Sequence, residues 1–172
     1  MKKLLIFITV LSLMSCSKKQ PESVDNNLIS NPSFEDANGF SFQDWNGALI
    51  SSSTDTPSNG ENYALQIEPG WAPSEGFAET SISNIQGTVS LHFSCEAKAI
   101  DWTGRIIILK ENQNGDRTEI RNITFDNTQW QNISFDINTT MNNTDVLIVH
   151  LSAGACEITY GYVLFDNVVL TD

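Results

Sequence analysis

The amino-acid sequence predicts an all-β domain built as an antiparallel β-sandwich. Short stretches in which apolar and polar residues alternate recur at a spacing of about ten residues, and turn signals separate them. No window shows the periodicity that an amphipathic helix of three turns would need. Because no helix is available to cover a sheet, we expect the strands to bury their apolar faces against a second sheet.

The clearest predicted strand covers residues 87–98. Its alternate residues form an apolar set and a polar set, namely Val89, Leu91, Phe93, Cys95 and Ala97 against Ser90, His92, Ser94, Glu96 and Lys98. Further strands are predicted over residues 48–52, 62–68, 77–82, 105–111, 118–125, 130–137, 146–151 and 162–170. Residues 112–116 contain an Asn-Gly pair typical of a hairpin turn, and residues 138–144 and 154–161 are predicted loops.

The N-terminal segment is predicted to be a targeting signal. Lys2 and Lys3 precede an apolar run, residues 4–13, that is too short to span a membrane as a helix. The following Leu13-Met14-Ser15-Cys16 resembles a bacterial lipobox, which implies cleavage before Cys16 and lipidation of that cysteine. We therefore expect a signal peptide over residues 1–15, a flexible tether over 16–27 and one folded domain over 28–172. The alternative is an ordinary secretory signal with a chance cysteine.

The charge balance argues against two classes of partner. The chain has a formal net charge of −12, and four of its nine basic residues (Lys2, Lys3, Lys18 and Lys19) precede the predicted domain. An acidic surface repels phosphate groups, so nucleic acid and anionic membrane surfaces are poor partners. Acidic side chains also suit calcium or neutral polar ligands, although solubility alone would explain them.

Two cysteines remain if Cys16 is lipidated. An exported protein can form a disulfide between Cys95 and Cys156. However, Cys95 lies on the apolar side of its predicted strand, where a buried free thiol is common. The sequence leaves both alternatives open, because the distance between the two residues cannot be read from it.

Five segments together carry a more specific pattern. They are Asn31-Pro32-Ser33-Phe34-Glu35 with Trp45, residues 63–67, residues 90–98, Trp130 with Ile133 and Phe135, and residues 164–170. Their order and spacing resemble the jelly-roll carbohydrate-binding modules of families 4, 9, 16 and 22, within the galactose-binding-like superfamily. The resemblance covers the chain from Leu28 onward. It implies a jelly-roll sandwich in which Phe34 helps to close the core.

The resemblance also implies a structural calcium ion. In these modules calcium commonly links the N-terminal segment to the last strand, and the matching carboxylates here are Glu35 and Asp166. Backbone carbonyls near Asn31 and Gly60-Glu61 would complete the shell, since calcium takes six to eight oxygen ligands. The alternative is that both carboxylates accept hydrogen bonds from turn amides and hold no metal.

Aromatic and polar side chains are the candidate ligand contacts. Trp71 and Trp102 lie in predicted loops, where their rings are available to stack on a sugar, and Tyr160 would add a further ring. Each loop tryptophan could equally pack onto the edge of the sandwich. Trp45 and Trp130 match family positions that are usually packed, so we expect them in the core.

Polar side chains on the predicted strands extend this set of candidates. His92, Glu96 and Asn132 face away from the core, and in this fold one sheet is concave and forms a groove. Arg105 would supply hydrogen-bond donors there. A solvated sheet face is the simpler interpretation of any one of these residues.

These observations predict a non-catalytic, envelope-anchored domain that binds a polysaccharide or oligosaccharide. The chain has no Ser-His-Asp signature, phosphate loop or zinc-ligand spacing, so we expect no enzyme. The expected partners are a glycan, the lipid anchor at Cys16 and envelope proteins. The expected location is the bacterial cell envelope, in the periplasm or on the outer-membrane surface. The alternative function is a structural or protein-interaction module of the envelope with the same fold and no sugar site.

Overall fold

A computed structural model describes residues 26–36, 38–156 and 160–172. Every regular element among these residues is a β-strand, and no helix in this part of the chain is long and apolar enough to cross a membrane. The strands are β1 (Glu35–Asp36), β2 (Gly39–Phe40), β3 (Asn46–Ala48), β4 (Ile50–Ser53), β5 (Ala64–Ile67), β6 (Gly70–Trp71), β7 (Gly76–Ile82), β8 (Gly87–Ile100), β9 (Gly104–Glu111), β10 (Arg117–Phe125), β11 (Gln131–Met141), β12 (Val146–Cys156) and β13 (Tyr162–Thr171).

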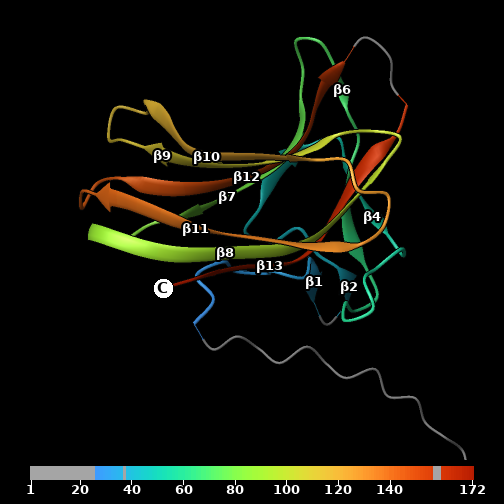
Figure 1. The fold of residues 1–172 in the computed structure, drawn as a ribbon, viewed down its shortest axis with the longest axis horizontal. Coiled ribbons are helices and arrows are strands. Elements are labelled where there is room, and N and C mark those ends of the chain that lie inside the picture. Colours follow the sequence, from blue (N-terminus) through green and yellow to red (C-terminus); the bar gives the residue numbers. More distant parts are fainter. Residues whose placement is uncertain (1–25, 37, 157–159) are drawn as a thin grey trace, which may run out of the picture.

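The long strands form two sheets that lie face to face (Figure 1). One sheet has the order β10-β9-β12-β7-β3 and is called here the β12 sheet; the short β6 pairs with β12 beyond this path. The other has the order β11-β8-β13-β5-β4 and is called the β13 sheet. Neighbouring strands along both of these orders are antiparallel, whereas the short β6 runs parallel to β12. The predicted antiparallel sandwich is therefore confirmed.

The core lies between the two sheets and follows the predicted alternation. On β8, Leu91, Phe93 and Ala97 are buried, whereas His92 is exposed. Phe34 is fully buried and its ring lies 5.0 Å from that of Trp45, which confirms that both residues close the core. Burying side chains of this size is the main favourable contribution to the stability of such a domain.

Cys95 is a free thiol in this core. Burial among apolar side chains raises its pKa well above the ordinary range, and the negative charge of Glu96 adds to the effect. Of the two alternatives left open by the sequence, the structure shows the buried thiol. Such a thiol is a weak nucleophile, because the thiolate is the reactive form.

The structure differs from the predicted strands mainly along β12. A loop is predicted from residue 154, but β12 continues through Gly154 to Cys156, with a bulge between Ser152 and Gly154 where it pairs with β7. The sequence Ser152-Ala153-Gly154-Ala155 has no alternating pattern, which is why no strand was predicted there. It forms a strand because it pairs with the neighbouring strands β6 and β7. The short strands β1, β2 and β6 are also absent from the sequence prediction for the same reason.

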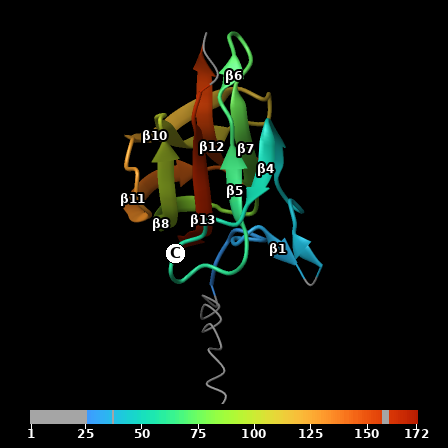
Figure 2. The same ribbon diagram turned by 90° about the vertical axis from the view of Figure 1, so that its right-hand side faces the viewer.

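The two ends of the described chain lie side by side (Figures 1 and 2). The side chain of Asn27 donates to Val168 O at 3.1 Å and accepts from Leu170 N at 2.9 Å. The backbone amide of Leu28 donates to Leu170 O at 2.8 Å. The folded domain thus includes Asn27, one residue before the predicted boundary. The predicted signal peptide, Cys16 and the tether up to residue 25 lie outside the described residues.

Candidate functional site

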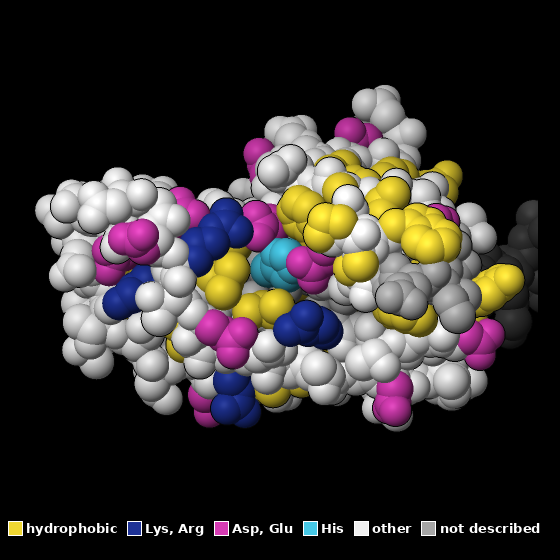
Figure 3. Space-filling view, turned by 90° about the horizontal axis from the view of Figure 1, so that it is seen from above, with side chains coloured by type: hydrophobic (Ala, Val, Ile, Leu, Met, Phe, Trp, Pro, Cys, Tyr) yellow, Lys and Arg dark blue, Asp and Glu magenta, His cyan; other side chains and the backbone are white. Residues whose placement is uncertain are grey.

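The outer face of the β12 sheet is recessed. Ile107, Ile148, His150 and Ser152 point away from the core, yet each is at most 9% exposed. Antiparallel registration places Ile107, His150 and Glu79 in one row across β9, β12 and β7. Figure 3 looks onto this face and shows a histidine flanked by acidic, basic and apolar side chains. Neighbouring side chains contribute to this burial, since Phe77 stacks on His150 and Glu75 accepts a hydrogen bond from Ser152.

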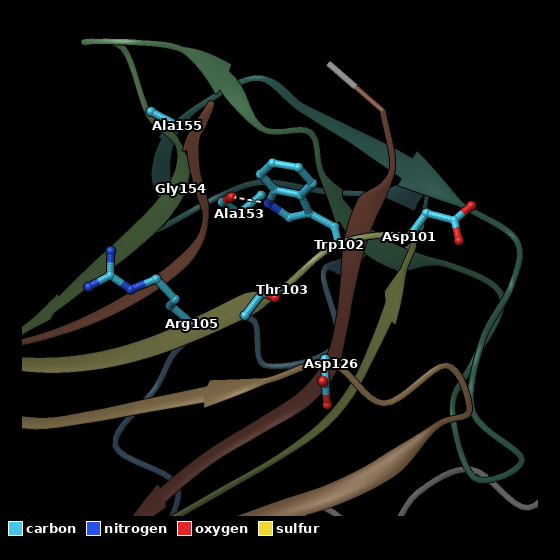
Figure 4. Close-up of a pocket in the computed structure, with 8 residues that line it drawn as sticks. All are labelled: Asp101, Trp102, Thr103, Arg105, Asp126, Ala153, Gly154 and Ala155. Carbon is cyan, nitrogen blue, oxygen red and sulfur yellow. Dashed lines mark hydrogen bonds between the residues drawn. The ribbon is translucent and has the colours of Figure 1, made fainter. Parts of the chain in front are cut away.

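A pocket of about 540 Å³ opens at one end of this recessed face. It is lined by Asp101, Trp102, Thr103, Arg105, Asp126, Ala153, Gly154 and Ala155. The indole of Trp102 is half-buried, packs against the core and donates a hydrogen bond from Nε1 to the carbonyl of Ala153. Figure 4 shows this ring and the guanidinium group of Arg105 on the two sides of Gly154, with the Asp101 carboxylate directed away from them.

Arg105 is the basic residue of this pocket, and it is available to a ligand. It stands on β9 next to Ser152 of β12, and within the described part of the chain its guanidinium group has no hydrogen bond or ion pair. A guanidinium group presents five N–H donors. The pocket therefore combines an aromatic ring with free donors, and Asp126 is the other charged residue of its lining beside Asp101.

Two exposed aromatic residues lie on the predicted loops. Trp71 is 62% exposed on β6, and its neighbour Gly70 pairs with Ala155 of the pocket wall. Tyr160 is 75% exposed at the start of the segment that leads into β13. Trp71 thus stands on a strand that borders the pocket, whereas Trp102 forms part of the pocket wall. Trp130, expected in the core, is half-buried and donates from Nε1 to Asp55 at 2.9 Å.

A second pocket, of about 390 Å³, lies at the β3–β7 edge of the same sheet. Its lining is Leu28, Ser30, Asp44, Trp45, Asn46, Glu79, Thr80 and Ser81. Arg105 belongs to the first pocket and Glu79 to the second, and strand pairing places Ser152 and His150 between them. The two pockets therefore lie at opposite ends of a path of about 10 Å across three strands.

Sequence reasoning missed the polar network on this path. His150 Nδ1 lies 2.8 Å from Glu79 Oε1, and the imidazole ring is stacked on Phe77 with centroids 5.4 Å apart. Arg117 donates to Glu79 at 2.8 Å and to Glu111 at 2.7 Å. The available signal was a single histidine within the apolar run of residues 146–151. That signal could not identify its partners, because Glu79 is 71 positions away.

Three predicted ligand residues are not brought to the pocket. His92, Glu96 and Asn132 lie on β8 and β11, in the other sheet. His92 Nδ1 lies 2.8 Å from Asp136 Oδ1, and Asn132 is the cross-strand partner of Glu96. These side chains point to the outside of the β13 sheet, as predicted, but that surface faces away from the recessed face of the β12 sheet.

Glu35 approaches Asp166, as predicted, and Glu61 joins them. Asp166 is fully buried, and Oδ2 of its carboxyl group has no hydrogen-bond partner among the described residues. Burial raises the pKa of Asp166 to about 7, and the negative charges of Glu35, Glu61 and Glu96 add to this effect. Burial and the neighbouring Glu35 carboxylate likewise raise the pKa of Glu61.

The acidic cluster around Asp166 has one feature that argues against a bound calcium ion and another that suits it. The described residues contain no group of three or more His, Cys, Asp or Glu side chains arranged to hold a metal ion. Glu35 Oε1 accepts hydrogen bonds from the amides of Asn62 and Tyr63, at 2.6 and 2.5 Å, which is the metal-free alternative. However, Asp166 Oδ2 and Asn31 Oδ1 are buried oxygens without partners in this part of the chain. A buried, unpartnered Asp166 oxygen beside mutually repelling carboxylates suits calcium if backbone carbonyls complete the shell.

Comparison with solved structures shows which proteins share this fold. A structure titled "Family 16 Carbohydrate Binding Module-2" has a TM-score of 0.61 at 14% identity, over 85% of this chain and 100% of that chain. The CBM22-1 xylan-binding domain of Paenibacillus barcinonensis Xyn10C has a TM-score of 0.58 at 14% identity, over 85% and 94%. The structure of TmCBM61 in complex with β-1,4-galactotriose has a TM-score of 0.52 at 15% identity, over 84% and 97%. At these identities the similarity shows the fold.

A family model shows the relationship at the level of sequence. No curated protein matches the chain in a sequence search. The model CBM_4_9, described as "Carbohydrate binding domain", matches residues 26–155 and so covers most of the chain. That range includes the strands that carry the pocket, the recessed face and most of the core. This chain therefore belongs to the carbohydrate binding domain family described by that model.

Proposed function

We propose that this protein is a non-catalytic glycan-binding lipoprotein whose ligand lies across the outer face of the β12 sheet. The observation that carries the proposal is the pocket lined both by the half-buried ring of Trp102 and by Arg105, whose guanidinium group is unpaired among the described residues. Trp71 would extend the aromatic surface at the rim of this pocket. His92, Glu96 and Asn132 are left out of the proposed site, because they lie on the other sheet.

The chemistry of this surface suits a neutral sugar chain. Sugars present C–H faces that stack on aromatic rings, and their hydroxyl groups bond to polar side chains. Each stacking contact or exposed hydrogen bond contributes on the order of 1 kcal/mol, so we expect weak binding per site. The names of two neighbours in fold, a xylan-binding domain and a β-1,4-galactotriose complex, make neutral β-linked glycans the first ligands to test.

We expect this domain to bind its glycan without catalysing a reaction. Ser152 Oγ donates to Glu75, whereas His150 bonds to Glu79. Within the described residues these contacts do not form the Ser–His pair that nucleophilic catalysis requires.

We also propose a structural calcium ion and an envelope location. Asp166, Glu35 and Asn31 would hold the ion, with backbone carbonyls near Gly60 and Glu61, and the ion would offset the repulsion among the carboxylates. The lipobox-like sequence ending at Cys16 supports a lipid anchor. Since Asn27 begins the folded domain, the segment after Cys16 would act as a short tether between membrane and domain.

The test is a glycan-binding screen of the purified full-length chain by calorimetry, with neutral and acidic polysaccharides. We expect one neutral class to bind, and the Arg105→Ala variant to bind it about tenfold more weakly, since hydrogen bonds from a charged donor contribute roughly 1.5–3 kcal/mol. Arg121→Ala is the matched control, because Arg121 lies over the ring of Phe135, away from the pocket. If no polysaccharide binds the folded protein, the glycan proposal is wrong and the protein-interaction alternative gains.

A further inference from the structure

Arg105 differs from the other basic residues of the described chain, because its guanidinium group forms no hydrogen bond, ion pair or ring contact there. The others all have partners: Lys98 with Asp55, Lys110 with the carbonyl of Thr140, Arg117 with Glu79 and Glu111, and Arg121 with the ring of Phe135. The chain has a formal net charge of −12, so carboxylates are plentiful. The unpaired cation is therefore a property of its position in the pocket.

The positions around Arg105 on the sheet carry no charge. Its cross-strand partners are Thr124 on β10 and Ser152 on β12. Two positions along the chain lie Thr103, which also lines the pocket, and Ile107, which shares the outer side of β9. Because none of these four side chains is charged, the sheet itself supplies no counter-ion for the guanidinium group.

Three carboxylates lie around the pocket without pairing with Arg105. Asp101 and Asp126 belong to its lining, and Figure 4 shows both carboxylates directed away from the guanidinium group. Glu75 accepts a hydrogen bond from Ser152, the cross-strand neighbour of Arg105. These negative charges repel a ligand that carries many anionic groups. A single anionic group placed at Arg105 would instead be compensated by the guanidinium charge.

The shape of the guanidinium group favours a carboxylate as that anionic group. Its planar fork matches the two oxygens of a carboxylate through two parallel N–H···O bonds. The ring of Trp102 lines the same pocket and can stack on the C–H face of a sugar. A uronic acid carries both features, a sugar ring with C–H faces and a carboxylate. The pocket volume of about 540 Å³ is in the range of small-ligand sites.

We propose that the pocket takes a uronic acid branch of an otherwise neutral glycan, and that Arg105 binds its carboxylate. The inference rests on the proposed function and names the class of ligand at that same site.

The rest of the outer face of the β12 sheet explains why the main chain of the glycan stays neutral. Past Ser152 this face carries the carboxylates of Glu75 and Glu79. Arg117 is already bound to Glu79 and Glu111, so it is not available to a second acidic sugar. A glycan with an isolated uronic acid therefore fits this face better than a polymer made of uronic acids.

The first experiment compares two forms of the same polysaccharides by calorimetry with the full-length chain. Glucuronoxylan and a glucuronic-acid-bearing arabinogalactan are used as such and after reduction of their carboxyl groups to primary alcohols. We expect both forms of at least one of them to bind, the native form about tenfold more tightly. Polygalacturonate, in which every sugar is acidic, should bind more weakly than that native form. Equal affinity for native and reduced forms would overturn the inference and leave the proposed function standing.

Arg105→Gln identifies the residue that distinguishes the two forms. The ratio of the affinities for native and reduced polysaccharide should fall from about tenfold to about one. Because the ratio is taken within one protein, a general weakening of the pocket cancels from it. Arg105→Lys should keep part of the ratio, since lysine retains the charge but lacks the planar fork. Arg121→Gln, over the ring of Phe135, is the control and should keep the full ratio. An Arg105→Gln variant that keeps the full ratio would overturn the inference.

The second experiment uses the wild type alone. Salt screens an ion pair in an open pocket, so the affinity ratio should fall as sodium chloride is raised from about 0.02 M to about 0.5 M. The affinity for the reduced form should stay nearly constant over the same range. A ratio that salt does not change would overturn the inference alone. Failure of every polysaccharide, whether native, reduced or neutral, would overturn the proposed function together with this inference.

Discussion

Asp166 shows how the behaviour of one residue depends on what surrounds it. Its carboxyl group is buried on β13, and Oδ1 accepts a hydrogen bond from the amide of Asn167 at 2.7 Å. Gly60 lies against Oδ2, where a Cβ atom would leave no room for that oxygen. Burial and the neighbouring carboxylates disfavour the charged form, and a bound cation would reverse that preference.

The stability of the metal-free protein should therefore fall as pH rises. The pKa of folded Asp166 is raised to about 7, above the value of about 3.9 for an unfolded aspartate. Its stabilising contribution is thus complete below about pH 4 and is lost as pH rises through about 7. We expect a loss on the order of 4 kcal/mol, measured by denaturant unfolding in a chelator.

Asp166→Asn separates this effect from other titrations. In a chelator the variant should be more stable than the wild type at pH 8 and should show a flatter pH dependence. In calcium the wild type should gain about 2.7 kcal/mol at a concentration of 100 Kd, and the variant should gain little. Asp136→Asn, on the exposed face of β11, is the control. If calcium does not change the free energy of unfolding of the wild type, the calcium proposal is wrong.

Among the elements, β12 connects the core to the recessed face. Val149 and Leu151 point into the core, whereas His150 and Ser152 point to the outer face. The strand bulges before Gly154, which has a φ of +68° and lines the pocket. Beyond the bulge, Ala155 pairs with Gly70, and this pairing brings Trp71 to the rim. The bulge thus lets one strand serve both the sheet and the pocket.

Gly154→Ala should weaken glycan binding through this bulge. An alanine at a φ of +68° costs roughly 1–2 kcal/mol, although no atom lies within 4 Å of the new Cβ. Gly87→Ala is a matched control, since its φ is +80° and its surroundings are equally open, but it begins β8 in the other sheet. Both variants should lose similar stability in denaturant unfolding, and only Gly154→Ala should lose affinity. Equal affinity in the two variants would argue against the pocket as the binding site.

For the whole molecule, the two ends of the described chain lie close together. Asn27 and Leu28 are bonded to the end of β13, so both ends of the described chain meet on one side of the sandwich (Figure 1). In the proposed arrangement, a lipid at Cys16 would tether the domain from this side. The segment between Cys16 and Asn27 is short and polar, which suits a tether.

Cys16→Ser should release the protein from the membrane. Without lipidation the chain loses the acyl groups, each of which contributes about 0.8 kcal/mol for every buried CH₂ group. The full-length wild type should sediment with membranes and require detergent for extraction, whereas the variant should not. Ser17→Ala, beside the modified position, should behave as the wild type does. A Cys16→Ser variant that still sediments with membranes would contradict the anchor.

The sequence alone determined the sandwich, the inward face of its strands and the role of Phe34. The sandwich and its inward faces depend on local alternation and turn chemistry, which neighbouring residues carry, whereas the role of Phe34 follows from the resemblance of its segment to the family. Tertiary structure alone decided that Trp102 lines a pocket while Trp71 is exposed. It also decided that Arg105 lies on the β12 sheet while His92 and Glu96 lie on the β13 sheet.

The row of Ile107, His150 and Glu79 also comes from tertiary structure, through the pairing of strands far apart in the chain. Alternation indicates which side of a strand is buried, but not which strand becomes its neighbour or which sheet curves around a ligand. Those properties arise only when the register between distant strands is set by packing of the whole core.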